Sequence, residues 1–310
     1  MLKAFLLIVV GLAGDPEHGA LFLKWGSALA EASEKVGVTR DRLVYLADVK
    51  GEDARVNGRA TREEIGKALA GFALAAAPDD VVYVVLVGHG NYDGRTPRFN
   101  LPGPDITAAD FNGLLRKLPA RNVVFVNTSS SSGPFIEELS APGRTIITAT
   151  RNGAEQFTTL FGGYFVEAFS SEAADADKNR RVSMLEAFQF AKNEVARAYE
   201  REGLLATEHA MLDDNGDKKG SQDPTATGAE GKLAAALSLG SAADAAPLPD
   251  DPKLRALYLE RRELERRVEA LRLLKDSLPP AKYVSELERL VTDLALKTRE
   301  IRTIEGDRTP

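Results

Sequence analysis

The sequence predicts an α/β fold in which a mostly parallel β-sheet is sandwiched between helices, with an α-helical hairpin added at the C-terminus. Short aliphatic runs alternate along the chain with amphipathic stretches of helical length. The runs are apolar at nearly every position, which is typical of strands buried on both faces of a parallel sheet. The hairpin is predicted by apolar residues at three-and-four spacing after residue 253.

The elements follow one another in a regular order. The apolar runs predict strands at residues 4–11, 42–48, 80–88, 122–127 and 144–150. Helices are predicted near residues 17–36, from Thr61, from Thr107, and near 134–140, 162–170 and 183–201. Thr61 with Glu64 and Thr107 with Asp110 have the spacing of capping boxes, which mark helix starts.

The first thirteen residues allow two interpretations. A lysine, a short apolar run and the small residues Gly11 and Ala13 resemble a signal peptide. The same run, AFLLIVVG, is typical of a buried strand, and we favour the strand because the following turn and helix would otherwise lack one. As the chain stands we expect a cytoplasmic protein, whereas a signal peptide preceding or overlapping the N-terminus would make it periplasmic or secreted. The run is too short for a membrane span, which needs roughly 20 apolar residues.

Composition excludes several classes of function. The chain has 40 Lys and Arg against 46 Asp and Glu, a net charge of −6, so we expect no nucleic-acid partner. It contains no cysteine, which excludes disulfides, thiolate metal sites and a cysteine nucleophile. It has three histidines, and His18 and His209 lack partners at metal-ligand spacing, so we expect them to be surface or core residues.

Three segments are predicted. Residues 1–217 form the α/β domain, and residues 218–252, rich in Ala, Gly, Asp and Pro, have the composition of a flexible linker. Residues 253–305 contain two apolar-periodic stretches separated by Leu278-Pro279-Pro280. They predict either two helices folded back on each other or a coiled coil through which a homo-oligomer assembles.

Two strand ends carry unusual residues. The run at 80–88 leads into Gly88-His89-Gly90, and the run at 122–127 leads into Thr128-Ser-Ser-Ser-Ser-Gly133. Function collects at the carboxyl ends of the strands in a parallel sheet. The hydroxyl-rich segment is suited to hold an anion at the start of the next helix, or simply to cap that helix.

In this order the motifs resemble the caspase–legumain (clan CD) cysteine peptidases, and particularly the bacterial branch of the legumain-like, C13-type enzymes. The segments RTIITATRNGAEQ, FGGYFVEAF, RVSMLEAFQFA and EHAMLDDNGD are similar to further blocks of that branch, so the resemblance covers roughly residues 4–217. It implies a caspase-like fold and a hydrolase ancestry, with His89 in the position of the general base or acid. In the family, the nucleophilic Cys lies two residues before a Ser-Gly pair. The pair here is Ser132-Gly133, so Ser130 occupies the position of the Cys.

The serine is a serious departure from the family. A thiol is partly ionised at neutral pH, whereas an alcohol is a weak nucleophile unless an oriented base activates it. We therefore expect a pseudopeptidase that needs no cofactor and whose cleft binds a peptide or protein partner. An active endopeptidase with a Ser130–His89 dyad is one alternative. A structural or interaction protein assembled through its C-terminal hairpin is the other.

A second signal resembles a calcium loop. Oxygen-bearing side chains occupy EF-hand positions 1, 3, 5, 9 and 12, namely Asp175, Asp177, Asn179, Ser183 and Glu186. They predict a Ca²⁺ site, although Arg180 stands where that loop needs glycine. The alternative is a solvated turn followed by a helix with Ser183 and Glu186 as its capping box.

Two further polar stretches complete the sequence signals. Arg151 and Glu155, in the loop after the run at 144–150, are candidates for peptide specificity. Residues 212–223, which contain Asp213, Asp214 and an Asn-Gly pair, predict either a metal-binding loop or, as we favour, a solvated turn before the linker.

Overall fold

The structure is a computed structural model that describes residues 3–48, 53–179, 181–240, 248–273, 275 and 278–306. The chain separates into a larger unit, Lys3–Ser241, and a smaller one that contains the C-terminal helices. Two parts of the sequence predictions, the linker residues 241–247 and Arg180 of the calcium-like loop, lie outside the described residues.

The strands and helices follow the predicted order closely. The strands are β1 (Ala4–Val10), β2 (Leu43–Ala47), β3 (Val56–Arg59), β4 (Val81–Val87), β5 (Gly90–Tyr92), β6 (Pro97–Phe99), β7 (Ile106–Thr107), β8 (Asn122–Asn127), β9 (Arg144–Thr148) and β10 (Met211–Asp213). The helices are α1 (Pro16–Lys35), α2 (Arg62–Ala75), α3 (Ala108–Leu115), α4 (Phe135–Leu139), α5 (Phe161–Ala168), α6 (Met184–Glu202), α7 (Lys232–Ala236), α9 (Pro252–Leu273) and α10 (Pro280–Gly306), with a 3₁₀ turn at Arg40–Arg42.

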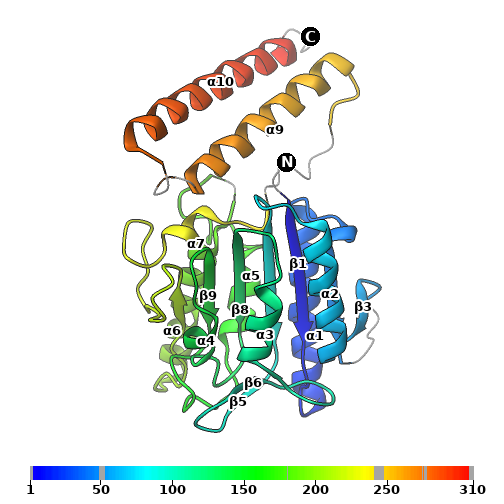
Figure 1. The fold of residues 1–310 in the computed structure, drawn as a ribbon, viewed down its shortest axis with the longest axis vertical. Helices are drawn as coiled ribbons and strands as arrows, with labels where there is room; N and C mark the ends of the chain where they lie inside the picture. Colours follow the sequence, from blue (N-terminus) through cyan, green and yellow to red (C-terminus); the bar gives the residue numbers. More distant parts are fainter. Residues whose placement is uncertain are drawn as a thin grey trace. The chain divides into compact units, whose positions relative to one another are not determined.

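The central sheet has seven strands in the order β10-β9-β8-β4-β1-β2-β3. All neighbouring pairs are parallel except β10 with β9, which confirms the predicted mostly parallel sheet (Figure 1). A second, antiparallel sheet of β5, β6 and β7 was not predicted. Its strands are only two or three residues long, which is too short for a hydrophobic period to show.

The N-terminal apolar run forms an interior strand of the sheet. β1 pairs in parallel with β2 on one side and with β4 on the other. All of its residues after Ala4 are buried, as are all seven residues of β4. The strand interpretation of residues 4–10 is therefore confirmed.

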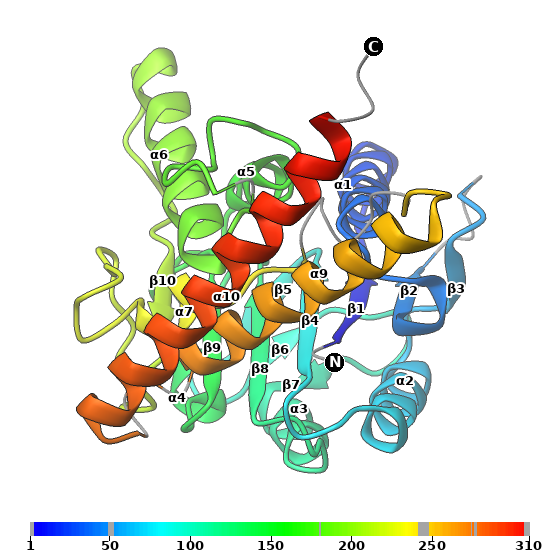
Figure 2. The ribbon, with the colours of Figure 1, turned by 90° about the horizontal axis from the view of Figure 1, so that it is seen from above.

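Helices cover both faces of the sheet. Seen from above, α1, α5 and α6 lie on one face and α2, α3 and α4 on the other (Figure 2). Alternate side chains of the strands, such as Phe5 of β1 and Phe125 of β8, form a core with residues of α2 and α3, including Ile65 and Phe111. The predicted capping box of α3 is complete, whereas in α2 the described contact is Thr61 accepting from the Glu64 N–H.

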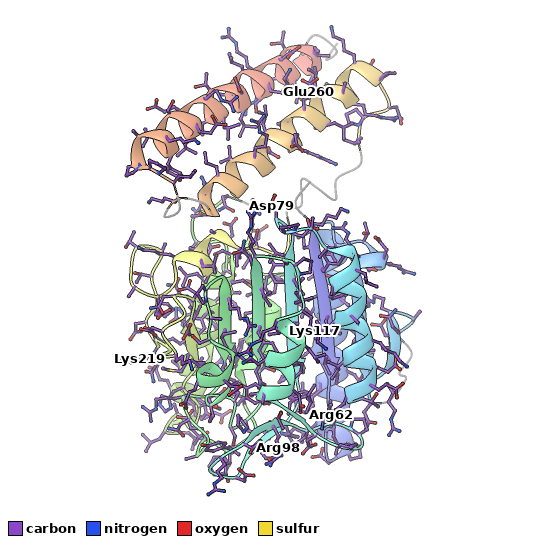
Figure 3. The ribbon with its side chains drawn as sticks, viewed as in Figure 1. Arg62, Asp79, Arg98, Lys117, Lys219 and Glu260 are labelled. Atoms are coloured by element: carbon purple, nitrogen blue, oxygen red, sulfur yellow. The ribbon has the colours of Figure 1, made fainter. Side chains whose placement is uncertain are left out.

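Charged residues mark the two edges of the sheet. Figure 3 shows Asp79 at the amino edge and Arg62 and Arg98 at the carboxyl edge. Arg62 pairs with Asp110 at 2.7 Å and Arg98 pairs with Asp93 at 2.8 Å. These partly exposed pairs contribute little stability, and the sheet is held by its buried strands.

Residues 218–240 differ from their linker-like composition. Leu237 and Leu239 are only 2% and 3% exposed. The Tyr83 hydroxyl donates to the Ser238 carbonyl at 2.6 Å, and the Met184 N–H donates to the Leu237 carbonyl at 2.8 Å. Two buried leucines and these backbone contacts hold the segment on the domain, which its average composition does not reveal.

The C-terminal unit is an antiparallel pair of helices. Leu254 and Leu257, near the start of α9, pack with Ile301 near the end of α10. A second cluster joins Val268 of α9 to Leu290 of α10. The two helices thus bury their apolar faces against each other, and assembly of copies through them stays a prediction. Among the described residues, no helix combines the length and apolarity needed to cross a membrane.

Close packing of α1 on the sheet generates a testable prediction. A Cβ added to Gly26 would lie 2.5 Å from the Tyr45 hydroxyl oxygen and 2.8 Å from a methyl of Val10. We expect Gly26→Ala to lower the free energy of unfolding by about 1–3 kcal/mol, measured by urea denaturation, because the core has no room for the methyl group.

Gly66 of α2 provides the matched control. Nothing lies within 4 Å of a Cβ added there. Gly66→Ala should therefore raise the free energy of unfolding by about 0.5–1 kcal/mol through helix propensity alone. Equal effects of the two substitutions would contradict the close approach of α1.

Candidate functional site

The two polar strand ends meet at the carboxyl edge of the sheet. β4 and β8 are neighbours, with Leu86 in register with Asn127. Gly88-His89-Gly90 follows the first strand and Thr128–Gly133 follows the second. The segments come into direct contact, since the Ser130 hydroxyl lies 3.1 Å from the Gly90 carbonyl oxygen.

Ser130 is bound to backbone and is buried. Its side-chain oxygen donates to the Gly90 carbonyl at 3.1 Å and accepts from the Gly90 N–H at 3.4 Å. The residue is only 4% exposed. The two hydrogen bonds described for this hydroxyl therefore both go to the residue that follows His89.

The neighbouring hydroxyls also bind the ends of strands. Thr128 donates to the Leu86 carbonyl at 2.8 Å, and Ser129 donates to the side-chain oxygen of Asn127 at 2.7 Å. Ser132 and Thr150 share a hydrogen bond of 3.1 Å, which joins the ends of β8 and β9. No side-chain hydrogen bond caps α4. The Phe135 N–H at its start donates instead to the Ser132 backbone carbonyl at 2.9 Å.

Two glycines permit this close approach. A Cβ on Gly90 would lie 2.6 Å from both the Ser129 hydroxyl oxygen and the Ser130 carbonyl oxygen. A Cβ on Gly133 would lie 2.3 Å from the Arg151 backbone. Any larger residue at either position would push the segments apart.

His89 is half-buried beside residues of α1. Its ring centroid lies 5.2 Å from that of His18 and 5.1 Å from that of Phe22, both edge-on. Burial lowers the pKa of the His89 imidazole, and the nearby His18 lowers it further. Both effects favour the neutral form of the ring.

A carboxylate stands behind this pair of imidazoles. Asp15 caps α1 by accepting from the His18 N–H, and its Oδ2 lies 2.6 Å from His18 Nδ1. The sequence analysis treated His18 as a surface or core residue and missed this grouping. The signal was present in the N-cap position of Asp15, three residues before His18.

Glu155 links the serine segment to the strand at the edge of the sheet. Its carbonyl oxygen accepts from the Ser131 N–H at 2.8 Å. Its carboxylate accepts from the backbone N–H groups of Arg151 at 2.9 Å and His209 at 3.0 Å, and lies 2.7 Å from His209 Nδ1. Glu155 therefore positions this loop, and a role of Arg151 and Glu155 in peptide specificity stays a prediction.

A small cavity adjoins this network between α5 and α6. Its volume is about 120 Å³, and alanines, Val195 and Phe161 line it together with Lys192, Glu208 and His209. The Glu208 carboxylate accepts from the N–H groups at the start of α5 at 2.7 and 3.0 Å. Burial raises the pKa of Glu208 despite these bonds.

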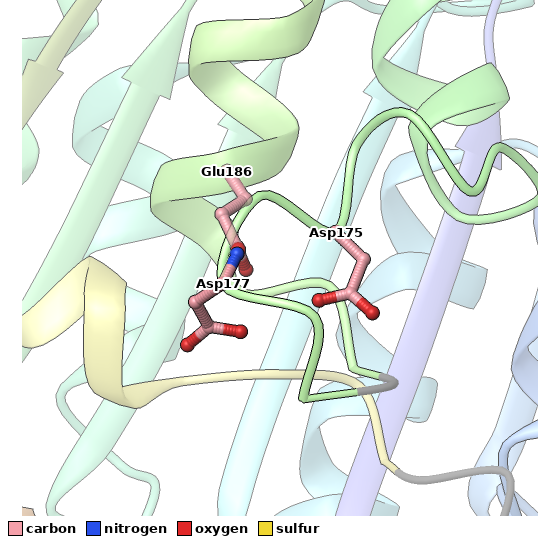
Figure 4. A group of neighbouring side chains, drawn as sticks. All are labelled: Asp175, Asp177 and Glu186. Atoms are coloured by element: carbon pink, nitrogen blue, oxygen red, sulfur yellow. The ribbon is translucent and has the colours of Figure 1, made fainter.

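The calcium-like loop brings three carboxylates together. Oxygens of Asp175, Asp177 and Glu186 lie within 4.8 Å of one another (Figure 4). Glu186 accepts from the N–H groups of Ala176 and Asp177 through one oxygen and forms the capping box of α6 with Ser183 through the other. The predicted capping box is therefore confirmed, and calcium binding stays a prediction.

Asn179 faces the same loop. Its backbone N–H donates to carboxylate oxygens of Asp175 and Asp177 at 3.0 Å each. Its side-chain amide donates to the other oxygen of Asp177 at 2.7 Å. The loop is thus organised by internal hydrogen bonds, as a polar turn is.

Comparison with solved structures and with curated sequences gives two findings. The crystal structure of the Drosophila initiator caspase Dronc is 13% identical to the chain and aligns with a TM-score of 0.45 over 70% of this chain and 81% of that one. Among curated protein sequences, none matches.

The sequence model of the peptidase C13 family matches residues 58–215, which include both His89 and Ser130. The match spans slightly more than half of the chain and ends close to the predicted domain boundary at 217. This chain therefore belongs to the peptidase C13 family.

Proposed function

We propose that this chain is a pseudopeptidase, a member of the C13 family without peptidase activity whose carboxyl edge binds a peptide or a protein partner. The observation that carries the proposal is the state of Ser130. A buried alcohol occupies the position that resembles the family's nucleophile, and its hydrogen bonds go to the Gly90 backbone.

The chemistry of the alcohol supports this proposal. A serine attacks a peptide bond only when an adjacent base removes its proton. The Ser130 proton is directed at a carbonyl oxygen, which is not a base at neutral pH. A thiol would be less dependent on such help because part of it is already ionised.

The surroundings of His89 support the same conclusion. Its ring packs against His18 and Phe22 of α1. In serine peptidases a buried carboxylate binds the catalytic imidazole and orients it toward the serine. Here the carboxylate of Asp15 is hydrogen-bonded to His18, and it acts on His89 through its charge.

Exposed apolar side chains at the same edge support a binding role. Leu12 follows β1 and is 41% exposed, whereas Phe157 and Leu160 lie in the loop after β9 and are 71% and 40% exposed. Large apolar side chains on loops at a functional edge are typical of surfaces that contact another chain. An extended peptide lying across these loops would cover them.

The first prediction from this proposal concerns activity. We expect no turnover of legumain-type or caspase-type peptide substrates and no labelling by serine-directed phosphonates, because nothing activates the Ser130 hydroxyl. Fluorogenic assays of the full chain, with Ser130→Ala and His89→Ala beside it, provide the measurement. Turnover that disappears in both variants would establish the active dyad instead.

The second prediction concerns stability. If the Ser130 hydroxyl is a structural tie between two strand ends, Ser130→Ala should lower the free energy of unfolding by about 1 kcal/mol, since a buried hydrogen bond is lost. Urea denaturation measures this. Ser170→Ala is the control, because that exposed hydroxyl donates only to the nearby Glu167 carbonyl. An equal or smaller loss for Ser130→Ala would contradict the structural role.

The third prediction concerns binding. On an array of immobilised peptides, the wild-type chain should be retained by a subset, and affinity for that subset should fall about tenfold in Phe157→Ser, because burial of one large apolar side chain is lost. Leu74→Ser is the matched control, since Leu74 is 92% exposed near the end of α2, away from the carboxyl edge. Equal losses in the two variants, or retention by no peptide, would exclude this binding surface.

A further inference from the structure

Three buried carboxylates lie at the edge of the sheet farthest from β3. Asp213 ends β10, Asp214 follows it, and Glu230 comes from the segment that precedes α7. Their exposed fractions are 0%, 7% and 7%. The sequence analysis expected residues 212–223 to be a solvated turn, so the burial of both aspartates corrects that expectation.

Backbone contacts fold the segment 214–240 onto these carboxylates. The Asp214 carboxylate accepts from the N–H groups of Gly231 and Ala234, both at 2.8 Å, and so caps α7. The Glu230 carboxylate accepts from the Asp214 N–H at 2.7 Å. Glu230 is thus hydrogen-bonded to the Asp214 N–H, and Asp214 to the N–H of Gly231, the residue after Glu230.

Asp213 is the third carboxylate of this group, beside Asp214 and Glu230. One of its oxygens accepts from the Ser140 hydroxyl at 3.1 Å and from the Gly216 N–H at 3.3 Å. Its other oxygen is buried, and the structure describes no hydrogen bond to it. Burial raises the pKa of Asp213, and the nearby charge of Asp217 raises it further.

No cation balances this group in the part of the chain that the structure describes, because none of the three carboxylates takes part in a described ion pair. The titratable groups that face Glu230 are Asp214 and Asp213. Buried carboxylates without a cation beside them resist full ionisation, so protonation of one of them is favoured. Burial, the hydrogen bond with the Asp214 side chain and these two charges raise the pKa of Glu230 to about 7.

A proton fits this place better than a metal ion. The oxygens of Asp175, Asp177 and Glu186 converge within 4.8 Å, and they are the only such group among the described residues. The oxygens of the three carboxylates near β10 do not all lie within 4.8 Å of one another. Asp214 and Glu230 instead accept hydrogen bonds from backbone N–H groups.

The segment also covers an open strand edge. β10 is the last strand of the sheet, and its free side pairs with the segment through two backbone hydrogen bonds between Leu212 and Ser221, of 2.9 and 2.8 Å. An uncovered edge strand presents unpaired N–H and C=O groups to other chains. The segment 214–240 therefore decides whether this edge is accessible.

We propose that a proton held by Glu230, beside Asp214, locks the segment 214–240 over the edge of β10, and that losing this proton loosens the segment. The pH range follows from the Glu230 pKa. Its folded value of about 7 exceeds the ordinary glutamate value of 4.5. The stabilisation is complete below 4.5 and is lost as the pH rises through 7.

Hydrogen–deuterium exchange of the full chain tests this proposal. Protection factors are compared at pH 6 and pH 8, since they correct for the faster intrinsic exchange at higher pH. For folded and open pKa values of about 7 and 4.5, linkage predicts that opening increases about tenfold between these conditions. We expect this tenfold loss of protection in peptides from residues 211–216 and 225–240. Peptides from β1 and β4 should show no such loss.

Two variants identify the group responsible. Glu230→Gln retains a carbonyl oxygen that accepts from the Asp214 N–H, and its amide can donate to the Asp214 carboxylate. Protection of the segment in this variant should therefore change less than twofold between pH 6 and pH 8. Glu200→Gln, at an exposed position of α6, should behave as the wild type. A pH dependence that persists in Glu230→Gln, or that is absent from the wild type, would overturn the proposal.

Discussion

The pairing of β4 with β8 is the constraint on which the candidate site depends. The two strands run in parallel and end at the same level, so the residues after them meet above the sheet. Gly90 then packs so closely on the serine segment that a Cβ would lie 2.6 Å from two of its oxygens. A larger residue at position 90 would push this segment away from the serine segment, and the arrangement at the carboxyl edge would be lost.

The hydroxyl groups of this edge satisfy backbone and side-chain partners that strand ends otherwise leave open. Thr128 bonds to the end of β4, Ser129 to the end of β8, and Ser132 to Thr150 after β9. Buried polar groups are costly unless they are hydrogen-bonded. Ser130 takes part in this pattern through Gly90, so its hydroxyl has a structural partner here.

Acidic residues in this chain act in two different ways. Asp175, Asp177 and Glu186 lie on a turn and bind its N–H groups, as an exposed polar loop does. Asp214 and Glu208 are buried and accept from the N–H groups at helix starts. Composition does not separate the two cases, because the same residue types and similar acidic spacing occur in both. Burial decides which carboxylates have a raised pKa, as Glu208 has.

Local sequence predicted most of the strands and helices, and it placed His89 and Ser130 at strand ends. Continuous apolar runs such as residues 4–10 and 81–87 predict buried parallel strands because no polar face interrupts them. The Thr107–Asp110 and Ser183–Glu186 spacings predict helix starts because the capping contacts are local. The positions of His89 and Ser130 at strand ends followed from the same patterns.

Only the tertiary structure decided which partners those residues contact. His18 reaches His89 because α1 packs across the end of β4, and Glu155 reaches His209 because β10 returns antiparallel to β9. Residues 218–240 look like a linker, yet Leu237 is buried, since a few long-range contacts outweigh average composition. Such contacts join residues tens of positions apart, and no local period or spacing records them.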